Sequence, residues 1–362
     1  MSKPIIIAYY LPQFHPTVEN DRWWGKGFTE WTNVAKARPL FAGHEQPKVP
    51  ADLGFYDLRY PEIKEQQAAL AREAGISAFC YWHYWLGDGR RLLSTPFEQV
   101  VRTGQPEFPF CLGWANHDWQ RKDWSSEASI VVRETLIRQT YGGAEDYARH
   151  FREMLPAFAD GRYLRIDERL AFVVFRPDSI PDTHVFVSTW NDLAAAHGLP
   201  GFFFIARTVD KGMASAHLGQ GYDAVNLSML DYAFGIEYTK RSILRRLVMS
   251  KLLGWKNVVP YADAIRIFDD PMNGDERVVP TLIPNWDHSP RSGAFGHILH
   301  GSTPELFERH AAQVLRSVQE KRLKVIFLAS WNEWGEGNYM EPDRRHGTGY
   351  VRALARALAE FE

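Results

Sequence analysis

The chain has 362 residues, a net charge of -2 and 45% hydrophobic residues, the composition of an ordinary globular protein with a full-size core. Its charges are spread along the chain, which excludes the basic footprint of a nucleic-acid-binding protein. No apolar run reaches the roughly 18 residues of a membrane span, and the run that Pro12 cuts off is too short for a signal peptide. Unless a leader was removed, we expect a cytoplasmic protein, of open oligomeric state.

Short, nearly continuous apolar runs predict eight strands that are buried on both faces, as in a parallel sheet covered by helices. They are Ile5–Tyr10, Ala78–Trp82, Phe110–Trp114, Ala171–Phe175, Phe202–Ala206, Ala224–Leu227, Thr281–Trp286 and Val325–Trp331. Helices are expected between several of them, at Pro61–Ala74, Ala144–Phe158, Thr183–His197 and Pro304–Lys321. Because no linker, repeat or low-complexity tract interrupts this alternation, we expect an α/β fold: a single (β/α)8 TIM barrel with extended loops, formed by residues 1–362.

Two further features concern burial and partners. Cys80 and Cys111 both lie inside apolar runs, which predicts buried free thiols and not a disulfide framework. Residues 239–256 combine basic and apolar side chains as an amphipathic helix does. Such a helix either contacts a membrane surface or covers the barrel with a solvated outer face, and we favour the second.

Polar and aromatic residues gather just after the predicted strands, at the end where barrel enzymes build their active sites. The groups are His83-Tyr84-Trp85, Ala115-Asn116-His117-Asp118-Trp119, Asp287-His288 and the residues 332–337. This convergence points to an enzyme. The 13 Trp residues fit a groove for flat sugar rings, and equally a barrel core packed with aromatics. We expect Trp82, Trp114 and Trp286 to surround one pocket.

The most informative motif is Asn332-Glu333-Trp334-Gly335-Glu336-Gly337, in which two carboxylates follow an apolar strand. Breaking a glycosidic bond needs a proton donor for the leaving oxygen and a second carboxylate as nucleophile or base. The apolar walls of Trp331 and Trp334, and the second carboxylate, would raise the pKa of the acid. Gly335 and Gly337 would let the loop turn so that both acids point into one pocket. The alternative is a pair of exposed loop carboxylates.

The histidines match no metal-binding pattern. His15, His83, His117, Asp118 and His288 could hold a metal only if they converged, and their spacing fits no compact ligand motif. We therefore expect neither a metal nor another cofactor. The chain also lacks an Asp-x-Asp triplet and a Gly-rich phosphate loop, which counts against a nucleotide-sugar donor held through a metal.

Several stretches together resemble the WbsX-type proteins of bacterial polysaccharide gene clusters. These stretches span nearly the whole chain and are residues 9–16 (YYLPQFHP), 23–34 (WWGKGFTEWTNV), 46–47 (QP), 53–59 (LGFYDLR), 79–85 (FCYWHYW), 114–116 (WAN) and 332–337 (NEWGEG). WbsX proteins are often labelled glycosyltransferases, yet they are similar to family 99 glycoside hydrolases. Those endo-acting α-mannosidases are (β/α)8 barrels with two glutamates in an Asn-Glu-Trp-x-Glu-Gly motif.

The resemblance implies a role for each glutamate. Glu333 would draw the proton from the 2-hydroxyl of the sugar, whose oxygen then attacks the anomeric carbon to form a 1,2-anhydro sugar. Glu336 would protonate the leaving oxygen and then act as base for water, so that configuration is retained without a covalent enzyme intermediate. Around this pair, we expect substrate contacts from residues in the shared motifs and at the strand ends: Tyr10, Gln13, Trp31, Trp82, His83, Tyr84, Trp114, Asn116, Asp118, Arg207, Trp286, Asp287, Asn332 and Trp334.

The chain departs from the family pattern after the third strand. The family commonly reads Trp-Ala-Asn-Glu-Asn-Trp, whereas this chain has His117 and Asp118 at the two central positions, so its sugar specificity is expected to differ. The leading hypothesis is a retaining glycoside hydrolase that acts on a bacterial surface polysaccharide or a related α-linked glycan. Two alternatives stay open: a glycosyltransferase or transglycosylase of O-antigen or capsule biosynthesis, and a non-catalytic glycan-binding barrel that has no need of paired glutamates.

Overall fold

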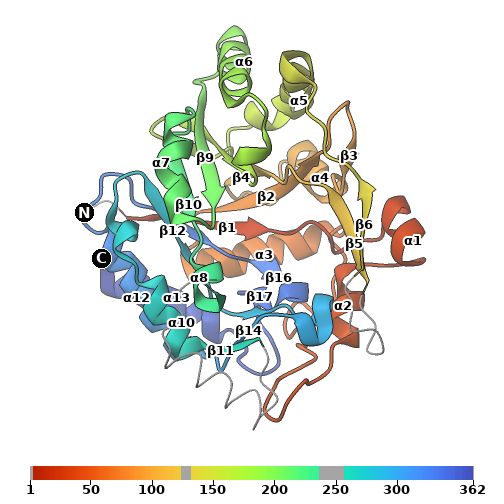
Figure 1. The fold of residues 1–362 in the computed structure, drawn as a ribbon, viewed down its shortest axis with the longest axis vertical. Coiled ribbons are helices and arrows are strands. Elements are labelled where there is room, and N and C mark those ends of the chain that lie inside the picture. The colour runs from red at the N-terminus through yellow and green to blue at the C-terminus, as the bar shows by residue number, and fades with distance from the viewer. Residues whose placement is uncertain (1–2, 124–131, 236–256, 362) are drawn as a thin grey trace.

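The computed structural model describes residues 3–123, 132–235 and 257–361, and its central element is a closed parallel barrel (Figure 1). The barrel strands are β1 (Ile5–Tyr10), β2 (Ala78–Trp85), β4 (Phe110–Trp114), β8 (Arg169–Val174), β9 (Phe202–Thr208), β10 (Ala224–Leu227), β12 (Val278–Leu282) and β15 (Val325–Leu328). Each strand pairs with the next in chain order, and β1 closes the ring by pairing with both β15 and β2. The short strands β3 (Arg91–Leu92) and β7 (Arg165–Ile166) extend this sheet by antiparallel pairing. The predicted (β/α)8 fold is confirmed.

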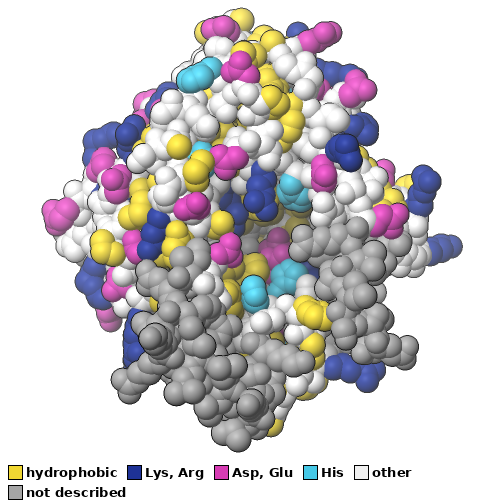
Figure 2. Space-filling view, in the orientation of Figure 1, with side chains coloured by type: hydrophobic (Ala, Val, Ile, Leu, Met, Phe, Trp, Pro, Cys, Tyr) yellow, Lys and Arg dark blue, Asp and Glu magenta, His cyan; other side chains and the backbone are white. Residues whose placement is uncertain are grey.

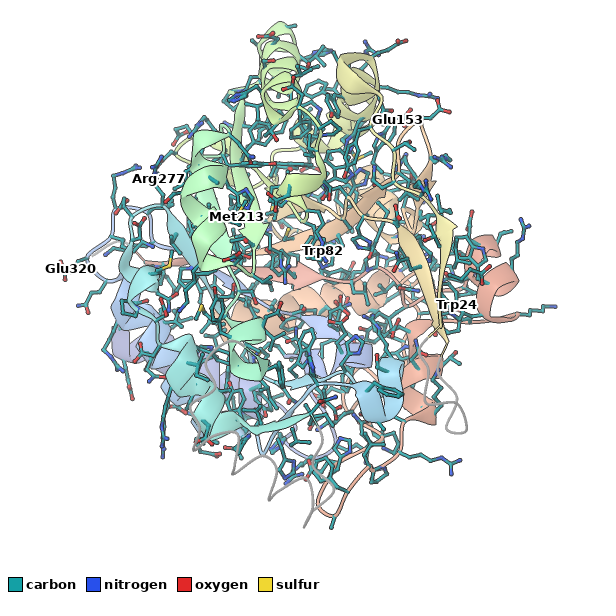
Figure 3. All side chains as sticks on the ribbon, in the orientation of Figure 1. Trp24, Trp82, Glu153, Met213, Arg277 and Glu320 are labelled. Atoms are coloured by element: carbon teal, nitrogen blue, oxygen red, sulfur yellow. The ribbon has the colours of Figure 1, made fainter. Side chains whose placement is uncertain are left out.

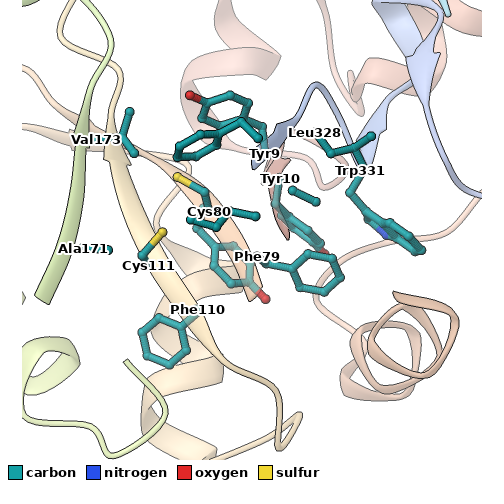
Figure 4. Packing of buried hydrophobic residues seen from close by; sticks show 14 of the residues in the cluster. Tyr9, Tyr10, Phe79, Cys80, Phe110, Cys111, Ala171, Val173, Leu328 and Trp331 are labelled. Carbon is teal, nitrogen blue, oxygen red and sulfur yellow. The ribbon is translucent and has the colours of Figure 1, made fainter. Parts of the chain in front are cut away.

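The barrel strands are buried on both faces, as their apolar sequences predict. Every residue of β4 and β10 is buried. Inside the barrel the ring of Tyr9 stacks on Trp82 and on Phe327, with centroid distances of 4.5 Å and 4.8 Å. Cys80 and Cys111 are register partners on β2 and β4, and both are buried free thiols, as predicted (Figure 4).

Helices lie around the outside of the barrel and in the loops between its strands (Figure 1). The longer ones are α3 (Pro61–Ala74), α4 (Thr95–Thr103), α5 (Gly143–Phe158), α6 (Thr183–Ala196), α10 (Tyr261–Phe268), α12 (Pro304–Val318) and α13 (Gly349–Phe361). The shorter ones are α1 (Val18–Trp24), α2 (Glu30–Lys36), α7 (Ala214–Gly219), α8 (Leu230–Phe234) and α11 (Ser289–Ser292). The four helices expected from the sequence are therefore present. None of the described helices is long and apolar enough to cross a membrane, and the basic segment 239–256 lies outside the described residues.

Two barrel strands differ from their predicted bounds in ways that affect the site. β2 continues to Trp85, so residues that were expected in a loop belong to the strand. β12 starts and ends earlier than expected, because Leu282 is the last residue that pairs with β15. Pro284 follows soon after, and a proline cannot donate to a strand ladder. Trp286 lies instead in β13 (Trp286–Asp287), which forms a small sheet with β14 (Ile298–His300) and β11 (Val258–Pro260).

Two hairpins outside the barrel sheet lie at the carboxyl ends of the barrel strands. After β4 the chain forms a hairpin of β5 (Trp119–Asp123) and β6 (Val132–Ile137), which lies beside α1 in Figure 1. The ring of Trp23 on α1 lies near the ring of Trp119 on β5, with the two centroids 6.3 Å apart. After β15 a second hairpin, β16 (Asn332–Glu333) and β17 (Asn338–Tyr339), carries the glutamate motif. These long loops place the motif among residues from both ends of the chain.

Candidate active site

A cavity of about 930 Å³ lies at the carboxyl ends of the barrel strands. Figure 2 shows acidic, basic and histidine side chains gathered near the middle of the face drawn. The cavity wall extends from Trp82 on β2 to Trp24 on α1, and the two lie well apart in Figure 3. Nine of the predicted site residues line it: Gln13, Trp82, Tyr84, Asn116, Asp118, Arg207, Trp286, Glu333 and Glu336.

The loop that carries the two glutamates is fixed by buried polar contacts. Asn332 accepts a hydrogen bond from the backbone N–H of Leu11 at 2.7 Å and donates to its carbonyl at 3.0 Å, which ties the loop to the end of β1. Glu341 accepts from the indole of Trp334 at 2.6 Å and from the hydroxyl of Tyr56 at 2.9 Å. Burial raises the pKa of Glu341 to about 7. Asn332 and Trp334 therefore hold the motif in place through buried contacts and do not line the cavity themselves.

The two glycines of the motif serve different purposes. Gly337 has φ +57°, in the left-handed region that favours glycine, and a side chain there would collide with Asp287. Gly335 needs no unusual φ, but a side chain there would collide with the carboxylate of Glu30 and crowd Arg291. The expected role in a tight turn therefore fits Gly337, whereas Gly335 makes room for two other side chains.

Arg291 on α11 is the central residue of the site, and sequence reasoning did not identify it. Its Nη1 donates to Glu336 and its Nη2 donates to Glu333 Oε2 at 3.1 Å. Its Nε donates to Glu30 Oε1 at 2.8 Å. One guanidinium thus holds three carboxylates, and it brings the two glutamates of the motif within reach of the same small region of the cavity. Arg291 lies just after His288, which the sequence singled out, yet nothing in its own local pattern marks it as functional.

The electrostatics of the pair follow from burial and from Arg291. Burial raises the pKa of Glu333 to about 8, the Arg291 cation opposes this rise, and the carboxylates of Glu336 and Glu30 add to it. Burial works against the charge of Arg291, but the carboxylates of Glu30, Glu336 and Glu333 hold its pKa well above the usual range. The side chain of Glu336 is 21% exposed and that of Glu333 only 11%. Glu336 is thus the member of the pair that solvent reaches more readily.

His288 and Trp286 complete the wall beside Glu336. The Nε2 of His288 lies 3.6 Å from Glu336 Oε1, and its Nδ1 is 2.8 Å from the hydroxyl of Ser292. The rings of Trp286 and His288 are stacked, with centroids 6.1 Å apart. Both residues line the cavity, so an aromatic face lies next to the more exposed carboxylate.

Three predicted contact residues lie on barrel strands but do not line the cavity, because alternate side chains of a strand point to opposite faces. Tyr10 donates from its hydroxyl to Gln67 on α3 at 2.7 Å. The Nε2 of His83 lies 2.8 Å from that of His150 on α5. Trp114 is fully buried, and its indole N–H donates to the carbonyl of Trp85 at 2.8 Å. The prediction that Trp114 shares a pocket with Trp82 and Trp286 is therefore wrong.

Four other predicted contact residues, Trp31, Asp287, Asn332 and Trp334, are also buried and absent from the cavity wall. Trp31 donates from its indole to the carbonyl of Tyr56 at 2.7 Å. Asp287 lies within 2.8 Å of the Nε2 of His44 and accepts from Gln46 at 2.6 Å. Burial opposes the charge of Asp287, but the hydrogen bond from His44 lowers its pKa. These residues support the loops and do not face the cavity.

The two tryptophans predicted to bind sugar should behave differently from each other. Trp286→Ala should weaken substrate binding by about 1–3 kcal/mol if its ring stacks on a sugar. Trp114→Ala should instead lower the free energy of unfolding by about 3–5 kcal/mol, because it leaves a cavity in the core. Substrate titration and urea unfolding of both variants separate the two effects. Equal losses of affinity at both positions would contradict this assignment.

Within residues 3–123, 132–235 and 257–361, no group of three or more His, Cys, Asp or Glu side chains is arranged to hold a metal ion. The candidate ligands His83, His117 and His288 illustrate the reason. His83 lies on the outer face of β2 beside His150, whereas His117 and His288 line the cavity. The five possible ligands named from the sequence are thus not brought together as one group.

The sequence profile described as Glycosyltransferase WbsX matches residues 6–354. This chain belongs to the WbsX family. Two curated relatives, both called "Uncharacterized protein WxcX" and from two strains of Xanthomonas campestris pv. campestris, are 34% identical to it over 98% of its length. The chain spans about half the length of these relatives, since the match covers 49% of each.

Solved structures show the fold of this WbsX-family chain in other proteins. The GH99 endo-alpha-mannosidase from Bacteroides thetaiotaomicron, in complex with BIS-TRIS-Propane, has a TM-score of 0.60 at 12% identity, over 99% of this chain and 97% of that one. A structure called "Glycoside hydrolase-like protein" has a TM-score of 0.62 at 13% identity, over 99% and 94% of the two chains. At these identities the likeness concerns the barrel fold.

Proposed function

We propose that this WbsX-family chain is a retaining glycoside hydrolase that acts on a bacterial surface polysaccharide or a related α-linked glycan. The observation that carries the proposal is the binding of Glu333 and Glu336 to two nitrogens of the Arg291 guanidinium, at the wall of one cavity. Two carboxyl groups beside a sugar-sized cavity are what glycosidic cleavage needs. The family and the barrel fold support a carbohydrate substrate.

In this proposal Glu333 is the base that takes the proton from the 2-hydroxyl of the sugar. A hydroxyl group is a weak acid, so its proton goes more readily to a base whose pKa is raised. Burial raises the pKa of Glu333 to about 8. The 2-oxygen then forms a bond to the anomeric carbon as the bond to the leaving oxygen breaks, which gives a 1,2-anhydro sugar.

Glu336 is the acid that protonates the leaving oxygen. In the second step Glu336 draws a proton from the water that attacks the anomeric carbon, the bond from that carbon to the 2-oxygen breaks, and Glu333 returns its proton to the 2-oxygen. The greater exposure of Glu336 suits the second step, since water must reach it. In this structure Arg291 binds Glu336, and a cation favours the charged form of a carboxyl group. The proposal therefore requires that substrate binding weakens this contact, so that Glu336 carries a proton when the bond breaks.

The rate should depend on pH through Glu333. A base works only when it is deprotonated, and the pKa of Glu333 is raised to about 8. We expect kcat/KM to rise with pH on the acidic side as Glu333 loses its proton, and to fall at higher pH once Glu336 no longer carries the proton that it must donate. Initial rates between about pH 5 and pH 10, on a substrate well below saturation, check this. A rate that is constant from about pH 6 upward would contradict the role of Glu333 as a base with a raised pKa.

The description of the family as a glycosyltransferase favours a second candidate, transfer to a sugar acceptor. The surface polysaccharide of the organism that encodes the chain, incubated with the full chain and without nucleotide sugars, distinguishes the two. Hydrolysis shortens the polysaccharide and releases oligosaccharides, which mass spectrometry detects. Growth of the polysaccharide only after nucleotide sugars are added would establish transfer and contradict hydrolysis.

A further inference from the structure

A basic wall lies in the cavity and takes no part in the mechanism above. Arg176 follows β8 and Arg207 lies near the end of β9, and both line the cavity. Their guanidinium carbons lie 5.3 Å and 4.7 Å from the ring centroid of Phe175, the residue that directly follows β8. Arg176 is exposed. Two cations therefore share one aromatic ring at a surface that a ligand can reach.

In the part of the chain that the structure describes, no hydrogen bond or salt bridge joins the side chain of Arg176 or Arg207 to a carboxylate. Burial lowers the pKa of Arg207, while the nearby carboxylates of Asp231 and Glu336 raise it without pairing with it. The cavity-lining Asp118 is engaged elsewhere, since its Oδ1 accepts from the backbone N–H of Gln139 at 2.8 Å. Arginine stays charged even when buried, so this wall keeps positive charge that no ion pair among the described residues offsets.

Three acidic residues of the cavity gather on a different wall. Glu30, Glu333 and Glu336 surround Arg291, and the strand that precedes the glutamate motif, β15, is separated from β9 in the ring by β10 and β12. On that wall the single cation Arg291 faces more than one carboxylate, whereas the wall of Arg176 and Arg207 carries two cations, so a ligand anion is attracted to the second wall. The charges of the cavity would therefore orient an acidic glycan in one direction.

We propose that Arg176 and Arg207 bind an anionic substituent of the glycan, either a sugar carboxylate or a phosphate or sulfate ester. This inference rests on the proposed function, in that it places a glycan in the cavity. Guanidinium groups pair with such anions through two parallel hydrogen bonds, which are stronger than bonds between neutral groups. An acidic sugar held at this wall keeps its charge away from the three carboxylates around Arg291.

The experiment compares binding of the full chain to the surface polysaccharide of its own organism before and after two chemical treatments. Carbodiimide activation and borohydride reduction convert sugar carboxylates to neutral alcohols, and mild dephosphorylation or desulfation removes the esters. We expect one of the two treatments to weaken binding about tenfold or more, which identifies the anion. Binding should also weaken as salt is raised.

Two substitutions test whether the loss of binding arises at the wall formed by Arg176 and Arg207. Arg176→Gln and Arg207→Gln should each weaken binding of the untreated polysaccharide about tenfold and bind the treated one as the parent does. Arg102→Gln, an exposed arginine on α4, is the matched control and should retain the parent affinity. Equal binding before and after both treatments, unchanged binding by both variants, or no binding of the untreated polysaccharide would overturn the inference. Because binding and the release of oligosaccharides are measured separately, acid-selective binding without cleavage would leave the inference standing and refute hydrolysis, and cleavage without acid selectivity would do the reverse.

Discussion

Glu336→Gln should lower turnover most on substrates with poor leaving groups, and a dinitrophenyl glycoside should partly restore kcat/KM, which reports the steps up to the departure of the leaving group. A glutamine cannot give a proton to the leaving oxygen, but dinitrophenolate departs without one. General acid catalysis contributes about 10²–10⁴-fold, so a loss of that size is expected on a natural glycan and a much smaller one on the activated substrate. Steady-state kinetics on both substrates measure the difference.

Glu333→Gln is the matched control for this experiment. It should lose a similar factor on both substrates, because the 2-oxygen must be activated whatever group leaves. Both glutamines keep the shape of the side chain, so substrate binding should survive. Rescue of Glu333→Gln and not of Glu336→Gln by the dinitrophenyl group would reverse the two roles.

Arg291→Met should lower the free energy of unfolding by about 3–5 kcal/mol, because it leaves buried carboxylates without their cation. The ion pairs of Arg291 with Glu30, Glu333 and Glu336 are the physical basis of this expectation. Activity should also fall sharply, since the guanidinium holds Glu333 and Glu336, the two proposed catalytic groups, together. Urea unfolding, followed by circular dichroism, gives the change in stability.

Two further variants test whether the loss comes from the uncompensated charge. Adding Glu30→Gln to Arg291→Met should recover part of the stability, because one of the unpaired carboxylates is then neutral. Arg322→Met removes an ion pair with Asp167 from a side chain that is 71% exposed, and should cost no more than about 1 kcal/mol. An Arg291→Met variant as stable as Arg322→Met would show that the ion pairs of Arg291 add nothing to stability.

The barrel could be predicted from the sequence because its strands are buried on both faces. Runs such as Ile5–Tyr10 and Phe202–Ala206 lack polar alternation, and the structure places both in the barrel. The approach of the two glutamates to one cavity was also predictable, since both follow a single strand in one short motif. Local signals of this kind need no knowledge of how distant segments meet.

The wrong site predictions arise because a position near the end of a strand does not tell which face of the strand a side chain occupies, or which distant residues it meets. Tyr10, His83 and Trp114 were grouped with the cavity because they stand near the ends of strands, yet the strand alternation turns them outward. Arg291 was missed for a different reason. Its partners Glu30 and Glu336 are 261 and 45 positions away, and no spacing pattern links residues that only the closed barrel brings together.

The most direct test of the central claim measures whether an oxygen atom from water enters the released oligosaccharide. The surface polysaccharide is incubated in ¹⁸O-labelled water with the parent chain, with Glu333→Gln and with Glu336→Gln, and the released oligosaccharides are weighed by mass spectrometry. We expect the parent to release oligosaccharides with one ¹⁸O at the new reducing end, and each variant to release far less. Release by both variants at the rate of the parent, or no release by the parent, would contradict the claim that this glutamate pair cleaves a glycosidic bond.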